Sequence, residues 1–249
     1  MSSASPIGVD IGGTGIKVAL VDLVKGALAG DRIRVATPSP ATPAAIAALV
    51  ASTVASVGGT GTVGLTMPSV VVDGVVTTAA NIDPSWIGTD ATELFEKATG
   101  RRVGVVNDAD AAGMAEMRYG AGAGHDGVVI LITLGTGIGS AVFHRGVLVP
   151  NTELGHLQMH HGDAEHWAAE SVREREDLSW SQWAHRVSSY LEHLERLLYP
   201  DLFLIGGGVS RKADKFVPLL TCKTPVKAAE LHNDAGIVGA AMVAPPEAT

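Results

Sequence analysis

The chain has 249 residues, which is long enough for one large domain or two small ones with a sizeable core. Hydrophobic residues make up 46% and charged residues 18%, so the composition is that of a globular protein. The formal net charge of −8 argues against a general nucleic-acid-binding protein, and the single cysteine, Cys222, excludes an intramolecular disulfide and a cysteine-based zinc site.

The first six residues have neither a basic region nor an apolar core, so we expect no signal peptide. An uncharged run at 127–143 contains four glycines and is too short to span a bilayer comfortably. We therefore expect a cytoplasmic protein without a membrane partner.

The first half of the chain is predicted to alternate strands with helices. Its predicted strands are 7–11, 16–21, 32–36, 63–66, 75–79 and 103–106, and its predicted helices are 43–57, 89–100 and 108–119. Thr42 followed by Pro43 is a typical helix start, and Gly100 a typical helix end.

The second half repeats the opening pattern of two strands around a glycine turn. Its predicted strands are 128–134, 140–144 and 202–205, and its predicted helices are 179–199 and 234–243. Ser179 and Gln182 have capping-box spacing at the start of the long helix. The repeated hairpin predicts two related lobes with a cleft between them, where small ligands usually bind.

Three glycine-rich turns follow apolar strands, at 10–17 (DIGGTGIK), 134–139 (LGTGIG) and 204–210 (LIGGGVS). Glycine lets backbone amides approach a phosphate closely. The candidate phosphate-binding residues are Gly12, Gly13, Thr14, Lys17, Gly135, Thr136, Gly137, Gly207 and Gly208. An ordinary hairpin explains any one turn, but three together favour phosphate binding. The P-loop motif and the complete dinucleotide fingerprint are both absent.

These motifs resemble those of the ROK family of actin-like sugar kinases. The first two turns are similar to the family's phosphate motifs, and residues 107–112 (NDADAA) and 153–156 (ELGH) are similar to its sugar-site signatures. Within the family, residues 151–156, 210–215 and 81–86 resemble the polyphosphate glucokinases most.

The resemblance implies an α/β, two-lobed actin-like ATPase fold, related to ribonuclease H, with a central cleft. We expect a smaller domain at 1–107 plus 234–249 and a larger one at 108–233. The resemblance also implies a homodimer.

The resemblance assigns roles to individual residues. Asp108 is the expected catalytic base and also a sugar ligand, since phosphoryl transfer to a hydroxyl needs a carboxylate beside it; a helix cap is the alternative. The other expected sugar ligands are Asn81, Asn107, Glu153 and His156. A second sugar-binding glutamate is left open between Glu165 and Glu170. Asp10 is expected to hold Mg²⁺ through water.

No zinc is expected. Many ROK members carry a cysteine-rich zinc motif after their Glu-x-Gly-His, whereas residues 156–166 of this chain contain no cysteine. His156 and His160 have a spacing that would allow a shared metal, but surface histidines are the simpler interpretation.

A basic stretch at 211–227 stands out from the acidic chain. Arg211, Lys212 and Lys215 are the polyphosphate-binding candidates, with a solvated loop as the alternative. We predict transfer of the terminal phosphoryl group of polyphosphate to the 6-hydroxyl of glucose, with ATP as a second donor and mannose as a second substrate left open. The alternatives are an ATP-specific ROK hexokinase for another sugar and a non-catalytic sugar-binding or regulatory ROK protein.

Overall fold

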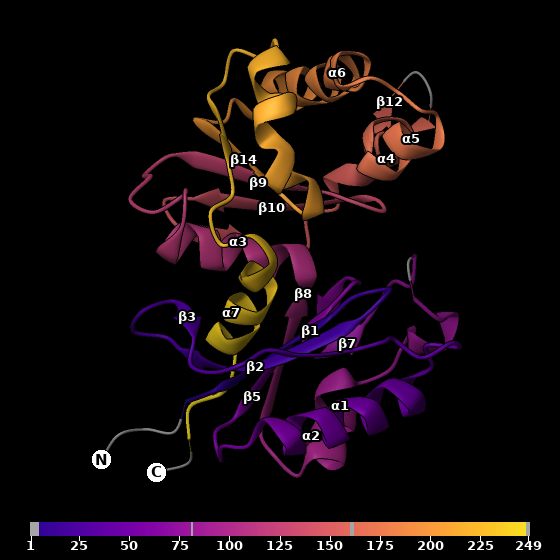
Figure 1. Cartoon of the computed structure of the whole chain (residues 1–249), viewed down its shortest axis with the longest axis vertical. Coiled ribbons are helices and arrows are strands. Elements are labelled where there is room, and N and C mark those ends of the chain that lie inside the picture. The colour runs from indigo at the N-terminus through magenta and orange to yellow at the C-terminus, as the bar shows by residue number, and fades with distance from the viewer. Residues whose placement is uncertain (1–4, 81, 160–161, 248–249) are drawn as a thin grey trace. The chain divides into compact units, whose positions relative to one another are not determined.

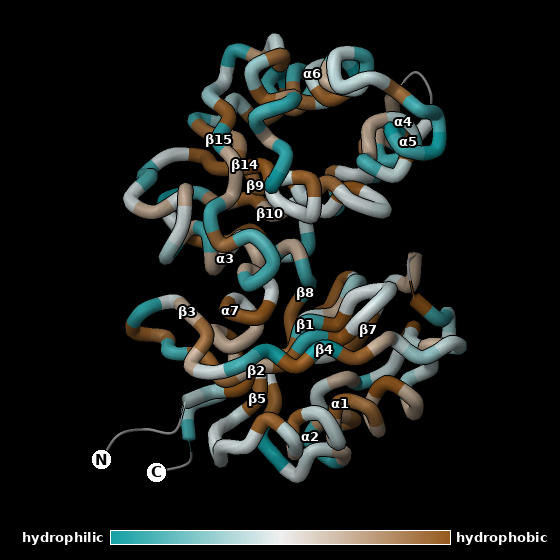
Figure 2. The backbone as a smooth tube through the Cα atoms, viewed as in Figure 1, coloured by the Kyte–Doolittle hydropathy of each residue, from teal (hydrophilic) through white to brown (hydrophobic). Residues whose placement is uncertain are grey.

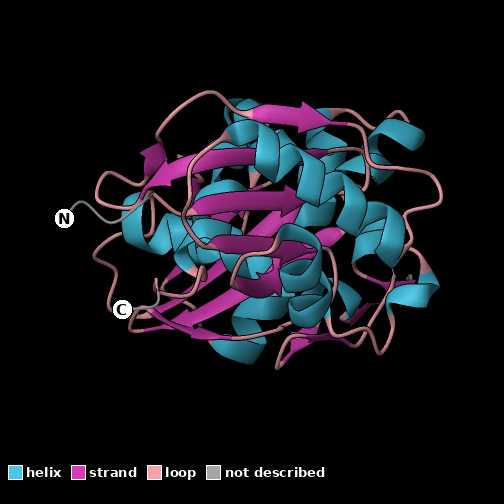
Figure 3. Cartoon of the chain, turned by 90° about the horizontal axis from the view of Figure 1, so that it is seen from below, coloured by secondary structure: helices cyan, strands magenta, loops and turns pink. Residues whose placement is uncertain are grey.

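The computed structural model describes residues 5–80, 82–159 and 162–247, which form two compact units (Figure 1). Helices and strands are mixed throughout the chain (Figure 3). The first unit comprises 1–115 and 234–249, and the second comprises 116–233. The division lies inside helix α3 (Asp108–Tyr119), whereas the sequence analysis placed it at residue 107. In the part of the chain that is described, no helix is both long and apolar enough to span a membrane.

The first unit is built on a mixed sheet with the strand order β3-β2-β1-β5-β8, and β4 also pairs with β2. The strands are β1 (Ile7–Ile11), β2 (Ile16–Asp22), β3 (Ala27–Leu28), β4 (Ile33–Val35), β5 (Val63–Met67) and β8 (Val103–Asn107). β1 and β2 form the expected antiparallel hairpin, and β5 and β8 continue the sheet in parallel with β1. A separate two-stranded hairpin of β6 (Val71–Val72) and β7 (Val75–Val76) replaces the predicted strand at 75–79.

Alternation along the central strands gives this sheet two different faces. Ile7, Val9 and Ile11 of β1 belong to a core that also contains residues of α1 (Pro43–Val57) and α2 (Ala91–Thr99). Thr42 caps α1 as expected, and Asp90 caps α2, which ends at Gly100 in the left-handed conformation. This face is therefore an ordinary apolar helix-on-sheet layer.

The opposite face carries a row of three glycines. Gly8, Gly64 and Gly104 are direct cross-strand neighbours on β1, β5 and β8. A Cβ atom on Gly64 would lie 1.7 Å from the Ala240 carbonyl oxygen of α7 (Ala235–Met242), and one on Gly8 would lie 2.0 Å from the Ile237 oxygen. The row therefore allows the backbone of α7 to rest directly on the sheet (Figure 1).

The second unit contains a five-stranded sheet with the order β11-β10-β9-β14-β15. The strands are β9 (Val128–Leu134), β10 (Ile138–His144), β11 (Val147–Val149), β14 (Leu202–Gly206) and β15 (Val226–Ala228). β9 and β10 are the antiparallel hairpin that the sequence predicts, and β14 pairs in parallel with β9. Figure 2 shows β9 and β14 as strongly hydrophobic segments, as expected for buried strands.

Helix α6 (Trp180–Leu198) covers this sheet. Its apolar stripe is buried at Trp183, Val187, Leu191 and Leu194, whereas Leu198 is 39% exposed. Ser179 and Gln182 form the predicted capping box. The helix packs on large side chains such as Phe203 of β14.

The remaining elements of the second unit are short. They are η2 (Leu154–His156), β12 (Gln158–Met159), β13 (Gly162–Asp163), α4 (Glu165–Ala168), α5 (Glu170–Arg175), η3 (Gly208–Lys215) and η4 (Val217–Leu219). In the first unit, η1 (Pro84–Trp86) is a similar single turn, and η5 (His232–Asp234) is another that spans the point where the chain returns to the first unit. None of these short elements was predicted from the sequence.

A buried carboxylate joins the two ends of the second unit. Glu116, in the last turns of α3, accepts hydrogen bonds from the backbone amides of Ala121 (3.0 Å), Glu230 (3.1 Å) and Leu231 (2.7 Å). Glu116 thereby satisfies three backbone donors at once.

Candidate active site

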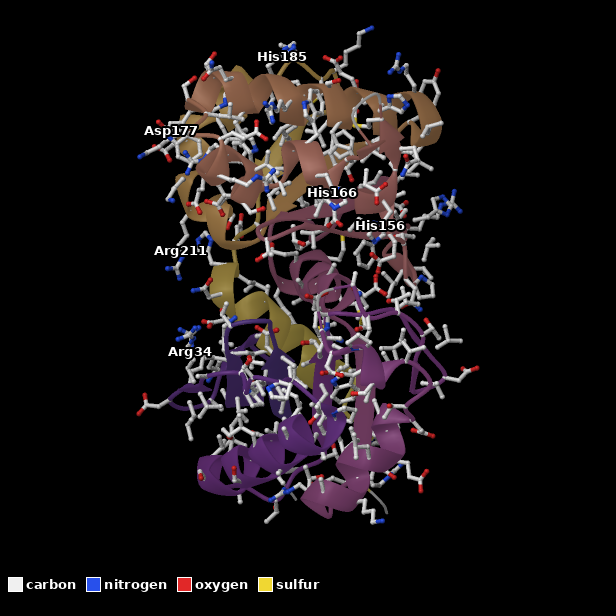
Figure 4. The ribbon with its side chains drawn as sticks, turned by 90° about the vertical axis from the view of Figure 1, so that its right-hand side faces the viewer. Arg34, His156, His166, Asp177, His185 and Arg211 are labelled. Atoms are coloured by element: carbon white, nitrogen blue, oxygen red, sulfur yellow. The ribbon has the colours of Figure 1, made fainter. Side chains whose placement is uncertain are left out.

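The first glycine turn joins β1 to β2 and is closed by a hydrogen bond from the Gly12 amide to the Gly15 carbonyl, 3.1 Å long. The Thr37 hydroxyl donates to the Gly12 carbonyl at 2.6 Å. Because a trans peptide directs its N–H and C=O to opposite sides, the Gly13 amide points away from Thr37. Arg34, which lies at the edge of the first unit (Figure 4), brings its guanidinium to within 3.0 Å of an ideal Cβ position on Gly15. The turn thus combines a directed amide with a nearby cation.

Asp10 and Lys17 face each other across this hairpin. They are cross-strand partners, and the Lys17 Nζ donates to Asp10 Oδ2 at 2.7 Å. Thr66 is the partner of Asp10 on β5, and its hydroxyl donates to Asp10 Oδ1 at 3.1 Å. Gly236 at the start of α7 leaves room for this carboxylate, because a Cβ there would lie 2.9 Å from the Asp10 carboxyl carbon. The carboxylate is therefore held in one place at the end of the strand.

Asn107 and Asp108 lie where β8 ends and α3 begins, as expected. Asn107 is buried, and its Oδ1 accepts hydrogen bonds from the amides of Ala109 (2.8 Å) and Asp110 (3.0 Å). Its Nδ2 donates to the Ser69 carbonyl at 3.1 Å. Asn107 therefore provides the helix cap, and the half-buried Asp108 opens the first turn with Oδ1 2.8 Å from the Ala109 amide.

The second glycine turn, between β9 and β10, is held against α5. The Ser171 amide donates to the Gly135 carbonyl at 3.0 Å, and the Ser171 hydroxyl donates to the Thr136 carbonyl at 2.7 Å. The amides of Thr136 and Gly137 belong to the same two peptides and point the opposite way. Two adjacent N–H groups directed to one side suit an anion.

The third glycine turn lies directly against the second. Gly207 has a φ of 80°, and a Cβ on it would lie 2.4 Å from the carbonyl oxygen of Leu134, the last residue of β9. Only glycine fits this conformation and this approach. Gly208 then begins η3, and Ser210 donates its hydroxyl to the Gly207 carbonyl at 2.9 Å.

The Glu-x-Gly-His segment packs on β10. A Cβ on Gly155 would lie 2.1 Å from the Ile138 carbonyl, so the glycine permits a backbone contact between η2 and the strand. The Ser140 hydroxyl accepts from the Leu154 amide at 2.9 Å and donates to the Thr152 carbonyl. These contacts fix Glu153 and His156 relative to the second turn.

Glu153 and His156 meet two further carboxylates. His156 Nδ1 lies 3.0 Å from Asp163 Oδ2 and 3.7 Å from Glu165 Oε1. Burial raises the pKa of the Glu153 carboxyl above its ordinary value; His156 acts against this shift, and the Glu165 carboxylate adds to it. Three carboxylates and an imidazole thus form one polar cluster.

Two glutamates were left open by the sequence, and the structure places them differently. Glu165 lies at this cluster, where its Oε2 accepts from the Ile138 amide at 3.3 Å. Glu170 lies instead 3.7 Å from Lys212 Nζ, and burial raises the pKa of its carboxyl while Lys212 opposes the rise. Only Glu165 is grouped with Glu153 and His156.

The cluster also bears on metal binding. One ligand atom each from His156, Asp163 and Glu165 lie within 4.8 Å of one another, a set that can hold a metal ion. His166, close to His156 in Figure 4, has its Nε2 3.9 Å from Glu165 Oε1. His160 lies outside the described residues, as does the sugar-ligand candidate Asn81.

Comparisons with known proteins place these motifs in a family. The sequence model of the ROK family matches residues 6–171. The chain belongs to the ROK family. The resemblance drawn from the motifs is thereby confirmed.

Individual relatives of this ROK protein are similar over almost the whole chain. A polyphosphate glucokinase of Mycobacterium tuberculosis is 54% identical over 97% of this chain and 92% of its own length. The crystal structure of an inorganic polyphosphate/ATP-glucomannokinase from Arthrobacter sp. strain KM is 52% identical, with a TM-score of 0.93 over 96% of this chain and 98% of that one. A ROK family glucokinase from Streptomyces griseus, in complex with glucose and AMPPNP, is 28% identical with a TM-score of 0.85 over 96% and 99%. The predicted fold class, α/β and actin-like, is confirmed.

The basic stretch of this ROK protein is divided by its fold. Lys212 and Lys215 lie in η3, with their Nζ atoms 5.9 Å and 5.7 Å from the ring centre of Trp180. Lys227 lies in β15, 3.5 Å from His125, and Arg211 projects at the edge of the unit, away from His156 (Figure 4). The stretch is therefore neither one loop nor one patch.

A further cation near Trp180 was not predicted from the sequence. Arg173 of α5 lies over the same Trp180 ring at 4.3 Å. It precedes the basic stretch by almost forty residues, and only the packing of α5 beside η3 brings it there. Its position in the last turn of a short helix gave no signal of this role.

Proposed function

We propose that this ROK protein transfers the terminal phosphoryl group of inorganic polyphosphate to the 6-hydroxyl of glucose. The observation that carries the proposal is the 54% identity with a polyphosphate glucokinase over 97% of the chain. The structural match to a polyphosphate/ATP-glucomannokinase supports it.

Asp108 is the proposed base. As the sugar oxygen attacks the terminal phosphorus, the Asp108 carboxylate accepts the hydroxyl proton. The bond between that phosphorus and the bridging oxygen breaks, and the shortened polyphosphate leaves with the electron pair. The Asn107 cap supports this role, because Asn107 occupies the capping position that was the alternative function of Asp108.

The donor phosphates are proposed to bind at the glycine turns. The directed amides of Gly13, Thr136 and Gly137 provide donors without charge, and Lys17 adds a cation. Lys212 supports the polyphosphate assignment, because it contacts Glu170, which directly precedes Ser171, the α5 residue that holds the second turn. Lys215 and Arg173 extend the positive charge around Trp180.

Glucose is proposed to bind through Glu153, His156 and Glu165. Their clustering supports this, because carboxylates and an imidazole accept hydrogen bonds from sugar hydroxyls and leave unpaired groups when the wrong sugar enters. Asn107 and Asn81 remain proposed ligands. Asn107 has less capacity to bind a sugar hydroxyl, because the oxygen and the nitrogen of its side-chain amide both already hydrogen-bond backbone groups.

Mg²⁺ fits the Asp10 site. The Asp10 carboxylate, held at the strand end by the Thr66 hydroxyl, can accept hydrogen bonds from the waters of a Mg²⁺ ion whose shell is completed by phosphate oxygens. Bound there, the ion would neutralise charge on the donor phosphates. Asp10 holds it in this proposal, and Lys17 offers a second positive charge beside it.

The proposal is tested by a coupled assay of purified protein with glucose or mannose against polyphosphate or ATP. We expect glucose with polyphosphate to give the highest kcat/KM, and the other pairs decide whether ATP and mannose are used as well. Activity with ATP alone would replace the proposal by an ATP-specific hexokinase, and no activity with any pair would favour a non-catalytic sugar-binding protein. The homodimer stays a prediction, which light scattering checks.

A further inference from the structure

The His156 ring is held through one of its two nitrogens. His156 ends η2, its side chain is 45% exposed, and its Nδ1 lies 3.0 Å from Asp163 Oδ2. An ionised carboxylate only accepts hydrogen bonds, so Nδ1 must carry the proton in this contact. In the neutral ring, Nε2 then keeps its lone pair and acts as an acceptor.

Asp163 is itself held in place. It lies on β13 directly opposite Gln158 of β12, and the Gln158 amide donates to Asp163 Oδ1. The Ala164 amide donates to the Leu157 carbonyl at 2.9 Å, which joins the two ends of this small hairpin. Both Asp163 oxygens are therefore engaged, one with Gln158 and the other with His156.

Glu165 is the other carboxylate near the ring, but it is not equivalent. Its Oε1 lies 3.7 Å from His156 Nδ1, beyond hydrogen-bond distance, and its Oε2 accepts from the Ile138 amide at 3.3 Å. Asp163 is the closer partner of the ring.

We propose that Asp163 is a positioning residue that fixes the tautomer of His156, so that Nε2 accepts a hydrogen bond from a sugar hydroxyl. The proposal rests on the proposed function, in which His156 binds glucose. Asp163 does not touch the sugar in this scheme. It decides whether the ring presents an acceptor or a donor to it.

The informative variant is Asp163→Asn. If Gln158 keeps donating to the side-chain oxygen, the Asn amide nitrogen faces His156 Nδ1 and donates to it. The His156 ring then carries its proton on Nε2, so that the Nε2–H group and the sugar hydroxyl, both hydrogen-bond donors, face each other. We expect the KM for glucose to rise about tenfold to a hundredfold, the range seen when a metal-binding histidine loses its outer-shell partner, with kcat at saturating glucose changed much less and the polyphosphate KM unchanged.

Asp177→Asn is the matched control. Asp177 is exposed in the same unit (Figure 4), and its φ of 49° suits asparagine equally well. It removes the same charge, so an unchanged glucose KM there separates the tautomer effect from net charge. Asp163→Glu keeps a carboxylate and should recover part of the glucose affinity.

Nitrogen-15 NMR of the histidine ring reports the tautomer directly and also shows that each variant is folded. We expect a protonated Nδ1 and a bare Nε2 in the wild type, and the reverse in Asp163→Asn. The same ring spectrum and the same glucose KM in both proteins would overturn the proposal. So would unchanged glucose kinetics in His156→Ala; polyphosphate-dependent activity of the wild type would still uphold the proposed function.

Elemental analysis separates this role from a metal site. We expect no stoichiometric zinc in the purified protein. Zinc that is present in the wild type and lost in Asp163→Asn would overturn the proposal, because Nδ1 would then bind a metal instead of carrying a proton.

Discussion

The two units share one strand order, β3-β2-β1-β5-β8 in the first and β11-β10-β9-β14-β15 in the second. Each begins with an antiparallel hairpin around a glycine turn, and in each a hydroxyl from elsewhere in the unit fixes a turn carbonyl. Thr37 does so in the first unit and Ser171 in the second. In both turns, a hydrogen bond to a carbonyl therefore directs the amide of the same peptide away from the hydroxyl.

The chemistry at the two turns differs. Asp10 and Lys17 form a cross-strand ion pair, separated from the first turn by one residue pair, whereas Thr133 and Gly139 occupy the matching register of the second hairpin. The helix layers differ as well, since α7 rests on a glycine row while α6 packs on large side chains. The shared strand order thus determines where the glycine turns lie, whereas the residues beside each turn determine whether it carries charged groups.

The largest effect is expected from the base in the first unit. Asp108→Asn keeps the shape of the side chain and removes the proton acceptor, so kcat should fall by about two to four orders of magnitude, with a much smaller change in glucose affinity. Glu153→Gln likewise replaces a carboxylate by an amide, in the second unit, and should mainly lower kcat/KM for glucose. Steady-state kinetics of both variants decide this; near-normal turnover of Asp108→Asn would show that the base lies elsewhere.

The glycine row is expected to matter next. Gly64→Ala places a Cβ 1.7 Å from the Ala240 oxygen, so α7 must shift. We expect the free energy of unfolding to fall by about 1–3 kcal/mol or more, measured by urea denaturation. Gly30→Ala is the control, because a Cβ on Gly30 meets no atom within 4 Å. Equal stability of the two variants would mean that α7 does not rest on the row.

The smallest effect concerns surface charge on the second unit. Replacing Lys212 and Lys215 together by alanine should raise the polyphosphate KM about threefold to tenfold, since each exposed contact contributes up to about 1 kcal/mol. The ATP KM should change less, and added salt should raise the polyphosphate KM more steeply because it screens every exposed contact.

The matched control replaces Lys223 and Lys227, which removes the same charge from the same stretch but away from Trp180. Kinetics with both donors at two ionic strengths check the prediction. Equal losses for polyphosphate and ATP would make the Trp180 cations an ordinary solvated surface.

Local signals were sufficient to predict much of the fold. Thr42-Pro43 and the Ser179–Gln182 box fix helix starts through bonds within four residues, and both were confirmed. The two hairpins followed from apolar runs around glycine turns, and their strands agree with the structure to within two residues.

Features that depend on pairing could not be predicted in this way. The glycine row exists because Gly8, Gly64 and Gly104 share a register across three strands, and their spacing along the chain does not reveal it. Asp163 meets His156 only because β12 pairs with β13, two strands of two residues each. The basic stretch looked continuous, but η3 and β15 separate its lysines.

Glu116 has a consequence for how the second unit can be handled as a piece of chain. This unit is one uninterrupted segment, and a single buried side chain near its start holds residues 230–231 near its end. The second unit is therefore a continuous segment whose two ends lie close together. Proteins usually tolerate the insertion or exchange of such a domain. Splices at 115/116 and 233/234 would leave Glu116 with all three of its hydrogen-bond partners. Segments exchanged between relatives at these points should therefore keep the hydrogen bonds that hold their two ends together.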